Sequence, residues 1–327
     1  MDMIKYEKKY WSQGIEFIAG IDEAGRGPLA GPVVASAVIF PHDVNLPEVT
    51  DSKKLTGKKR ERLFQDIMNV ALAVGLGVVH EREIDQINIL QSTYRAMQIA
   101  VEQLEIKPEI LLVDGRPADI EYYEQESIIK GDSKSLSIAA ASIIAKVTRD
   151  RMMINYDKVF PQYGFSGHKG YGSQKHIESI KTHLASPIHR QSFKPVSDYL
   201  PTLKYYKEKR LVSALGQELV ACQLVKNGCE IFEMNYNTHR IGEVSIISDN
   251  GGLLVFTDVK TQTKDDGWDK PRLEINEYKS RQIMSSARDY MDKNKLAIEF
   301  RFDVAEVILG QGKPKINIIK NGLYSSD

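Results

Sequence analysis

Residues 17–40, FIAGIDEAGRGPLAGPVVASAVIF, combine two apolar runs with an acidic, glycine-rich turn. The first run ends in Asp22 and Glu23, and the second run covers residues 33–40. Apolar runs separated by glycine and proline predict two β-strands joined by a turn. Adjacent carboxylates at the end of a buried strand repel each other unless a cation lies between them. The pattern indicates either a divalent-metal site or a solvated acidic turn.

Length and composition favour two folded domains and a local, not global, charged surface. The chain has 327 residues, 42% of them hydrophobic, with 44 basic and 44 acidic side chains. Any nucleic-acid surface must therefore be local. We expect a cytoplasmic protein that does not contact membranes, because no signal peptide or membrane-spanning run is evident. Cys222 and Cys229 lack a metal-binding spacing, so we expect reduced, buried thiols.

Two further apolar runs also lead into carboxylates. Residues 110–113 end at Asp114, and residues 127–129 precede Asp132. Single acids at strand ends are common, but a convergent set is hard to explain as surface decoration. Together with Asp22 and Glu23, they could build the all-oxygen site that hard cations prefer.

Alternation of strands with helical patterns predicts a layered α/β domain. Helices are expected at residues 56–69 and 135–155, and a strand at residues 75–80. A long helix should follow that strand, with one stripe of apolar residues in the core. This stripe consists of Ile87, Leu90, Tyr94, Met97, Val101 and Leu104.

Three strings in this half of the chain resemble one family. AGIDEAGRGPLAGPVV (residues 19–34), DSKKL (51–55) and AAASIIAKVTRD (139–150) resemble the pattern of ribonuclease HII, the bacterial type 2 ribonuclease H. The resemblance covers roughly residues 14–198. It implies the ribonuclease H-like fold, in which helices flank a mixed sheet.

The resemblance also implies roles for individual residues. Asp22, Glu23, Asp114 and Asp132 would be the catalytic residues and would hold two Mg²⁺ or Mn²⁺ ions. The turn Gly25-Arg26-Gly27 would read the ribose, and Tyr171 would pack on the following deoxyribose.

Three lysines complete the expected substrate-binding set. Lys53 and Lys54 suit either a solvated helix entry or phosphate contacts, and the family string favours phosphate. Lys169 precedes Tyr171 in the string HKGY. Residues 160–193 carry four histidines among lysines and aromatics, so we expect a basic surface that follows a phosphate backbone. A zinc site is disfavoured because no cysteines accompany them.

A second pattern begins after the first domain. We place the first domain at residues 1–200, a charged linker at 201–207 and a smaller α/β domain at 208–327. A helix with Leu211, Leu215, Leu219 and Cys222 on one face should open it. Strands are expected at residues 244–248, 253–260, 298–308 and 315–319, with a helix at 277–294.

The second domain resembles the YraN-like family, whose fold is similar to that of restriction endonucleases. The strings are GQELVACQLVKNG (216–228) and LLVFTDVKTQ (253–262). Glu218, Asp258 and Lys260 match the acids and lysine of such nucleases, but Ser245 stands where another acid is expected. Serine is a poor metal ligand, so we expect a vestigial site in an impaired nuclease or a nucleic-acid-binding module.

Together these patterns predict a fusion whose first domain is an endoribonuclease. It would cut the RNA strand of RNA–DNA hybrids, and it would cut 5′ of ribonucleotides in duplex DNA, leaving 3′-hydroxyl and 5′-phosphate ends. Such cutting serves ribonucleotide excision in DNA repair, without a small-molecule cofactor. Two alternatives stay open: a resolvase- or integrase-like two-metal enzyme of the same fold, and a non-catalytic nucleic-acid-binding fusion. The sequence identifies no protein partner.

Overall fold

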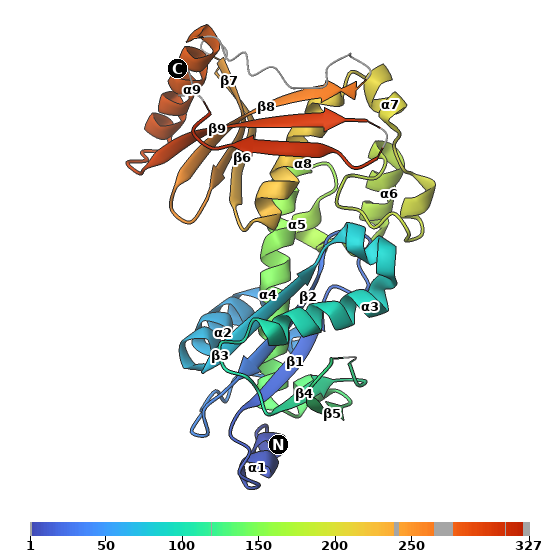
Figure 1. Ribbon diagram of the computed structural model, residues 1–327, viewed down its shortest axis with the longest axis vertical. Helices are drawn as coiled ribbons and strands as arrows, with labels where there is room; N and C mark the ends of the chain where they lie inside the picture. The colour runs from blue at the N-terminus through green and yellow to red at the C-terminus, as the bar shows by residue number, and fades with distance from the viewer. Residues whose placement is uncertain (1, 119, 239–241, 265–276, 311, 323–327) are drawn as a thin grey trace. The chain divides into compact units, whose positions relative to one another are not determined.

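The two apolar runs of residues 17–40 form neighbouring antiparallel strands in the computed structural model shown in Figure 1. Strand β1 covers Ile18–Ala24 and strand β2 covers Val33–Ile39. In their register Ile21 lies opposite Ala37. The structure describes residues 2–118, 120–238, 242–264, 277–310 and 312–322.

The first sheet has five strands in the order β3-β2-β1-β4-β5. The pairs β1–β2 and β2–β3 are antiparallel, whereas β1–β4 and β4–β5 are parallel. A mixed sheet flanked by helices is the expected fold class, and the expectation is confirmed. The remaining strands of this sheet are β3 (Ala73–Val79), β4 (Ile110–Asp114) and β5 (Glu124–Ile128).

Helices cover both faces of this sheet because successive side chains of a strand point to opposite faces. Ile21 shares an apolar cluster with Met97 of α3 on one face. Val38 shares another with Leu63 of α2 and Ile144 of α4 on the other face. The helices and helical turns of this part are α1 (Lys5–Trp11), η1 (Ser52–Lys54), α2 (Gly57–Val70), α3 (Glu81–Glu102), η2 (Gly131–Ser133), α4 (Leu136–Val159) and η3 (Val196–Asp198).

Helix α3 is kinked, and the kink divides the predicted apolar stripe. Asn88 has φ 67° and ψ 167°, which lie outside the helical region. Met97, Val101 and Leu104 are buried and Tyr94 is partly buried, but Ile87 and Leu90, which flank the kink, are 36% and 42% exposed. The prediction that the whole stripe is core is therefore wrong, because the kink breaks the 3.6-residue repeat on which it rests.

Contacts divide the chain into two compact units, and each is described by itself. The first comprises Met1–Met153, Lys169–Ser173 and Ile188–Asp198, and the remaining residues form the second. Compact units and domain limits need not coincide, so the limits 1–200 and 208–327 stay predictions. Residues of the expected linker form helix α7 (Leu203–Glu208), whose N-cap Thr202 accepts a hydrogen bond from the amide of Tyr205.

The second unit contains a sheet in the order β10-β9-β8-β7-β6. The predicted strands and helices are confirmed, and β6 is an additional strand that the sequence did not indicate. Gly216 of α8 packs on Thr261, whereas Tyr290 of α9 packs on Phe256, so the two helices cover opposite faces of β8. The elements are α5 (Phe165–His168), α6 (Gln174–His183), α8 (Val212–Lys226), β6 (Glu230–Thr238), β7 (Gly242–Asp249), β8 (Leu254–Thr263), α9 (Glu277–Lys293), β9 (Phe300–Leu309) and β10 (Lys315–Ile319).

Both cysteines are free and buried, as expected. Among the described residues, helices long and apolar enough to cross a membrane are absent.

Glycines let α3 approach strand β3 closely. A Cβ added at Gly77 would lie 1.9 Å from the carbonyl oxygen of Ala96. We expect Gly77→Ala to lower the free energy of unfolding by about 1–3 kcal/mol, because the helix backbone must move away from the sheet. Chemical denaturation measures this change. Gly57→Ala is the control, since a Cβ there meets nothing within 4 Å; equal stabilities of the two variants would contradict the packing argument.

Candidate active site

The four predicted carboxylates come from three neighbouring strands of the first sheet. Asp22 and Glu23 lie near the C-terminal end of β1, as expected, and the strand continues to Ala24. Ile21 pairs with Val113 in parallel register, and the next residue of β4 is Asp114. Asp132 follows β5 in the helical turn η2.

Hydrogen bonds hold these carboxylates in place. The Asp114 Oδ1 atom accepts from the amide of Gly131 at 2.6 Å, which ties the end of β4 to the turn that carries Asp132. The Asp22 Oδ1 atom accepts from the amide of Glu23 at 2.7 Å. Glu23 also pairs with the Arg26 guanidinium at 3.3 Å.

Burial and mutual repulsion make the charged form of these acids costly. Burial raises the pKa of Asp22 well above its usual range, and the charges of Glu23 and Asp114 raise it further. Burial also raises the pKa of Glu23, although Arg26 opposes that shift. The pKa of Asp132 is also raised, first by burial and second by the charge of Asp114. A bound cation would relieve all three shifts.

The donor set fits hard divalent cations, but the side chains form no closed cage as they stand. Within the part of the chain that the structure describes, no three His, Cys, Asp or Glu side chains are grouped closely enough to hold an ion. Their oxygens instead accept protein hydrogen bonds and salt bridges, including a 3.9 Å contact between Lys53 and Asp132. The metal role of the four acids therefore stays a prediction.

The glycine-rich turn beside the acids has a conformation that a side chain would disturb. Gly25 has φ +100°, and a Cβ there would lie 2.2 Å from the Arg149 Nε atom. A positive φ and this close approach both require glycine. At Gly27 a Cβ would lie 3.6 Å from the Tyr171 ring, so the turn and the predicted sugar-packing tyrosine are neighbours.

Two fully buried arginines bind backbone carbonyls of this turn, and the sequence analysis identified neither of them. Arg190 donates to the carbonyl oxygens of Gly25 at 2.5 Å, Arg26 at 2.9 Å and Gly31 at 3.0 Å. Arg149 donates to Ala30, Pro32 and Lys169, at 3.1, 2.9 and 3.0 Å. The sequence signal was only the arginines' place in the strings KVTRD and IHRQSF.

Burial lowers the pKa of Arg190 to about 9 and that of Arg149 to about 10. Both values leave the guanidinium groups charged at neutral pH. In a trans peptide the C=O and the following N–H point in opposite directions. Because the carbonyls of Gly25 and Arg26 point to Arg190, the amides of Arg26 and Gly27 point away from it.

The cationic side chains differ in what they contact. Lys54 lies 3.9 Å from Asp51 and Lys53 the same distance from Asp132. Burial lowers the pKa of Lys53, but the surrounding carboxylates, Asp22 first, outweigh it and raise that pKa. The backbone of Lys169 is fixed by Arg149. Tyr171 is 44% exposed, with the Lys146 ammonium 5.8 Å from its ring centroid.

The expected basic surface over residues 160–193 is wrong for most of its aromatic side chains and for two of its histidines, although Lys175, Lys181 and His183 are exposed. His176 and His189 are buried, at 0% and 1% exposure, and so are Phe160 and Phe165. His168 stacks on His176 with ring centroids 4.3 Å apart. Most of these rings fill a core, because aromatic side chains bury large areas, and Tyr171 is the aromatic residue that stays accessible.

In the second unit, three of the four predicted residues are neighbours. Lys260 pairs with Asp258 at 2.9 Å, and the Ser245 hydroxyl accepts from the amide of Val259 at 3.1 Å. Glu218 lies on α8, which covers the opposite face of β8. Burial raises the pKa of Glu218 to about 7. A single site that uses all four residues stays a prediction.

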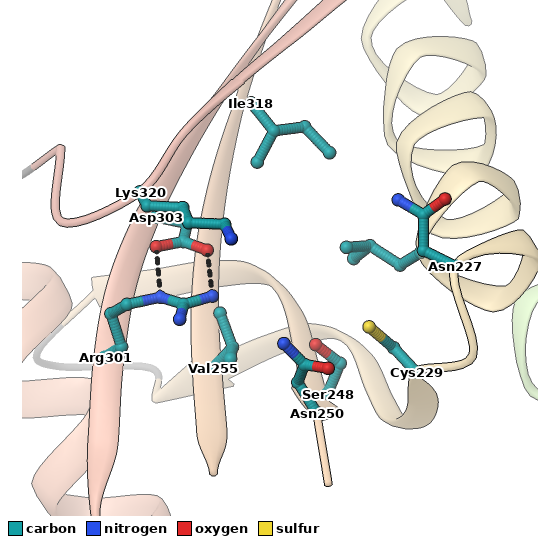
Figure 2. Close-up of a pocket in the computed structure, with 10 residues that line it drawn as sticks. Asn227, Cys229, Ser248, Asn250, Val255, Arg301, Asp303, Ile318 and Lys320 are labelled. Carbon is teal, nitrogen blue, oxygen red and sulfur yellow. Dashed lines mark hydrogen bonds and ion pairs between the residues drawn. The ribbon is translucent and has the colours of Figure 1, made fainter.

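Figure 2 shows a cavity of about 300 Å³ in the second unit. The Arg301 guanidinium makes two 2.8 Å hydrogen bonds to Asp303, which neutralise both groups. Cys229 also lines the cavity, and burial raises the pKa of its thiol. Ser248 and Val255 line the cavity on the face of the sheet that α8 covers. The cavity is therefore separate from Asp258 and Lys260. The neutralised pair and protonated thiol indicate no ligand class.

The hydrogen bonds of the buried guanidinium groups should contribute strongly to stability. We expect Arg190→Lys to lower the free energy of unfolding by about 2–3 kcal/mol, because one ammonium cannot satisfy all the buried carbonyls that the guanidinium serves. Arg26→Lys is the control, since its side chain is 52% exposed and an exposed pair contributes about 1 kcal/mol or less. Urea denaturation distinguishes them, and an equal loss in both would contradict the role of Arg190.

Two segments of the chain are similar to known protein families. Residues 19–196 match the family model Ribonuclease HII, and residues 216–307 match Uncharacterised protein family UPF0102. The ribonuclease HII of Acetivibrio thermocellus is 56% identical over 193 residues, which cover 59% of this chain and 75% of that protein. The ribonuclease HII of a Geobacillus species is 51% identical over 207 residues, covering 63% and 74%.

The crystal structure of ribonuclease H2 from Pyrococcus horikoshii is 29% identical and covers 56% of this chain and 96% of that chain, with a TM-score of 0.49. The assignment rests on the sequence matches alone. The second match agrees with the expected YraN-like, restriction-endonuclease-like part. Because the first family model covers more than half of the sequence, this chain belongs to the ribonuclease HII family.

Proposed function

We propose that this metal-dependent endoribonuclease cuts on the 5′ side of ribonucleotides embedded in duplex DNA, as well as within the RNA strand of RNA–DNA hybrids. The products would carry 3′-hydroxyl and 5′-phosphate ends, and the role would be ribonucleotide excision in the cytoplasm. One observation carries the proposal: buried acids lie next to a turn whose amides of Arg26 and Gly27 point away from a buried guanidinium.

Asp22, Glu23, Asp114 and Asp132 would hold two Mg²⁺ or Mn²⁺ ions. Ions bound there supply activation of water and stabilisation of the leaving 3′-oxygen. The protein contributes a preorganised set of oxygens, because the Gly131 amide fixes the Asp114 carboxylate before any ion binds. Repulsion among the buried acids favours occupancy, since the cations replace a costly desolvation with direct coordination.

Selection of the ribonucleotide would depend on the turn. The 2′-hydroxyl is the group that distinguishes RNA from DNA locally, and it can both donate and accept. The amides of Arg26 and Gly27 are oriented as donors to such an oxygen, and the Arg190 guanidinium opposes rotation of both peptides. Tyr171, which contacts the Gly27 position, would cover the next sugar and exclude a second 2′-hydroxyl.

Phosphate contacts would fix the strand. Lys53 and Lys54 are exposed, with side-chain exposures of 81% and 66%, and Lys169 lies next to Tyr171. Such contacts position a backbone without reading bases.

Cleavage of a duplex with one embedded ribonucleotide tests the function. We expect a single cut 5′ of that ribonucleotide with Mg²⁺ or Mn²⁺, cutting of the RNA strand in a hybrid, and no cut in an all-DNA duplex. Chelator should abolish cleavage, and Asp114→Asn should lower kcat at least about 100-fold, because it removes a ligand charge without changing shape. Gel analysis of end-labelled strands locates each cut.

Equal cutting of the all-DNA duplex would instead favour a resolvase- or integrase-like enzyme. An Asp114→Asn protein with normal melting temperature and normal activity would remove Asp114 from the site.

The tyrosine should control the preference for DNA after the ribonucleotide. We expect Tyr171→Ala to reduce kcat/KM on a single embedded ribonucleotide by about 3- to 5-fold, since packing on a sugar contributes no more than the lower end of aromatic–base stacking, about 1 kcal/mol. Activity on a run of ribonucleotides should change less. Tyr171→Phe keeps the ring and is the matched control. Unchanged flank preference in Tyr171→Ala would exclude this role.

The second domain would be an impaired nuclease that binds nucleic acid. Ser245 supplies a neutral hydroxyl that already accepts from the β8 backbone, and Lys260 pairs with Asp258. One carboxylate in this cluster gives a weak shell for a divalent ion. Binding by this domain would raise the effective concentration of the fused ribonuclease near its duplex.

In the full chain with Asp114→Asn the first site should not cut, so any remaining cleavage would come from the second site. We expect it to leave plasmid DNA and single-stranded RNA uncut with millimolar Mg²⁺ or Mn²⁺, while still binding DNA in a gel-shift assay. Lys260→Ala should weaken that binding, and Lys313→Ala, at an exposed lysine of the same unit, serves as the control. Cutting that Lys260→Ala abolishes would show that the site is active. Unchanged DNA binding in Lys260→Ala would point to a protein partner for the second domain.

A further inference from the structure

Helix α1 lies before the segment that matches the family model, yet it contacts both elements that flank Asp132. The helix covers Lys5–Trp11, and the family match begins at residue 19. Strand β5 ends four residues before Asp132, and α4 begins four residues after it. The short segment between these elements is held by the Gly131–Asp114 hydrogen bond and by the two elements that flank it.

Glu7 makes the contact with α4. It is 2% exposed, and its Oε1 atom accepts from the Ser135 hydroxyl at 2.6 Å, the Ser137 hydroxyl at 2.7 Å and the Ser137 amide at 3.0 Å. A carboxylate is favoured at the N-terminus of a helix, where amides lack intrahelical partners. The amide of Leu136 also donates to the Met3 carbonyl at 2.7 Å.

Tyr10 and Lys9 make the contact with β5. The Tyr10 hydroxyl and the Lys9 ammonium both bind the Glu126 carboxylate, the latter at 2.7 Å. The Tyr10 ring is buried in an apolar cluster with Ile128, the last residue of β5. One helix therefore holds the strand before Asp132 and the helix after it.

The start of α4 also packs closely against the strand that carries Asp22. A Cβ added at Gly20, two residues before Asp22 in β1, would lie 2.2 Å from the Ser137 carbonyl carbon. Further along α4, Ser142 acts to lower the pKa of Asp22, and its hydroxyl forms a 2.8 Å hydrogen bond with that of Ser52. A shift of the first turn of α4 would thus displace two of the four candidate ligands.

We propose that α1 is a clamp and that Glu7 and Tyr10 are positioning residues, which fix Asp132 and Asp22 in the arrangement that binds metal. The inference rests on the proposed function of these acids. Groups outside the ligand shell that orient the ligands affect metal affinity or activity by about 10- to 100-fold when they are changed. Because Glu7 acts through Ser137 and not on an acid directly, the lower end of that range applies.

The first test measures Mn²⁺ binding by isothermal titration calorimetry of the full chain without nucleic acid. We expect Glu7→Ala to raise the Mn²⁺ dissociation constant about 10-fold and Tyr10→Phe, which removes only the hydroxyl, about 3-fold. Glu7→Gln keeps an acceptor for Ser135 and Ser137 and should restore most of the affinity. Glu16→Ala is the matched control, because that side chain is exposed and lies outside α1.

The second test measures cleavage of the duplex with one embedded ribonucleotide. Glu7→Ala should lower kcat about 10-fold with KM for the duplex within about twofold of wild type, and raised Mn²⁺ should recover part of kcat. A double-mutant cycle with Ser137→Ala should be non-additive, because both changes break the same contact.

Unchanged Mn²⁺ affinity and kcat in Glu7→Ala would overturn the clamp, even if its melting temperature fell. A loss in Glu16→Ala equal to that in Glu7→Ala would overturn it as well. If wild-type protein binds Mn²⁺ but leaves the ribonucleotide duplex intact, the proposed function fails, while the calorimetric comparison still decides the clamp.

Discussion

Repulsion between buried carboxylates is the constraint on which the first unit depends. Asp22 and Asp114 lie on adjacent parallel strands, and burial together with the charges of Glu23 and Asp114 raises the pKa of Asp22. A fold that served stability alone would not gather such groups, because each desolvated charge costs free energy. The surrounding structure offsets part of that cost with hydrogen bonds, notably from the Gly131 amide. A divalent cation would offset the rest.

Two positively charged side chains are also buried near these acids, where they fix the backbone of the turn. Arg149 and Arg190 are fully buried and bind backbone carbonyls of the glycine-rich turn. Carbonyl dipoles satisfy a guanidinium without neutralising it, so these arginines fix the shape of the turn and leave its outward amides for a ligand. The acids therefore suit metal, and the arginines hold the neighbouring surface that would read the sugar.

The second unit contrasts with the first. Its Asp258 already has a cationic partner in Lys260, and Ser245 has a place in the hydrogen-bonding of β8. The Lys260 ammonium offsets the charge of Asp258, so these three residues attract a metal cation less strongly than the acids of the first site. Glu218 carries a strongly raised pKa, but its helix packs on the other face of β8.

The sequence by itself determined the family, the mixed α/β class and the acids at strand ends, because the alternation of apolar and polar residues and the short family strings are local properties of the chain. It also placed Gly25 correctly, since a tight turn there admits no Cβ. Tertiary structure alone decided that Arg149 and Arg190 serve the turn and that His176 is core. These depend on contacts between residues far apart in the chain, such as Glu7 with Ser137, and a local pattern carries no record of such pairs.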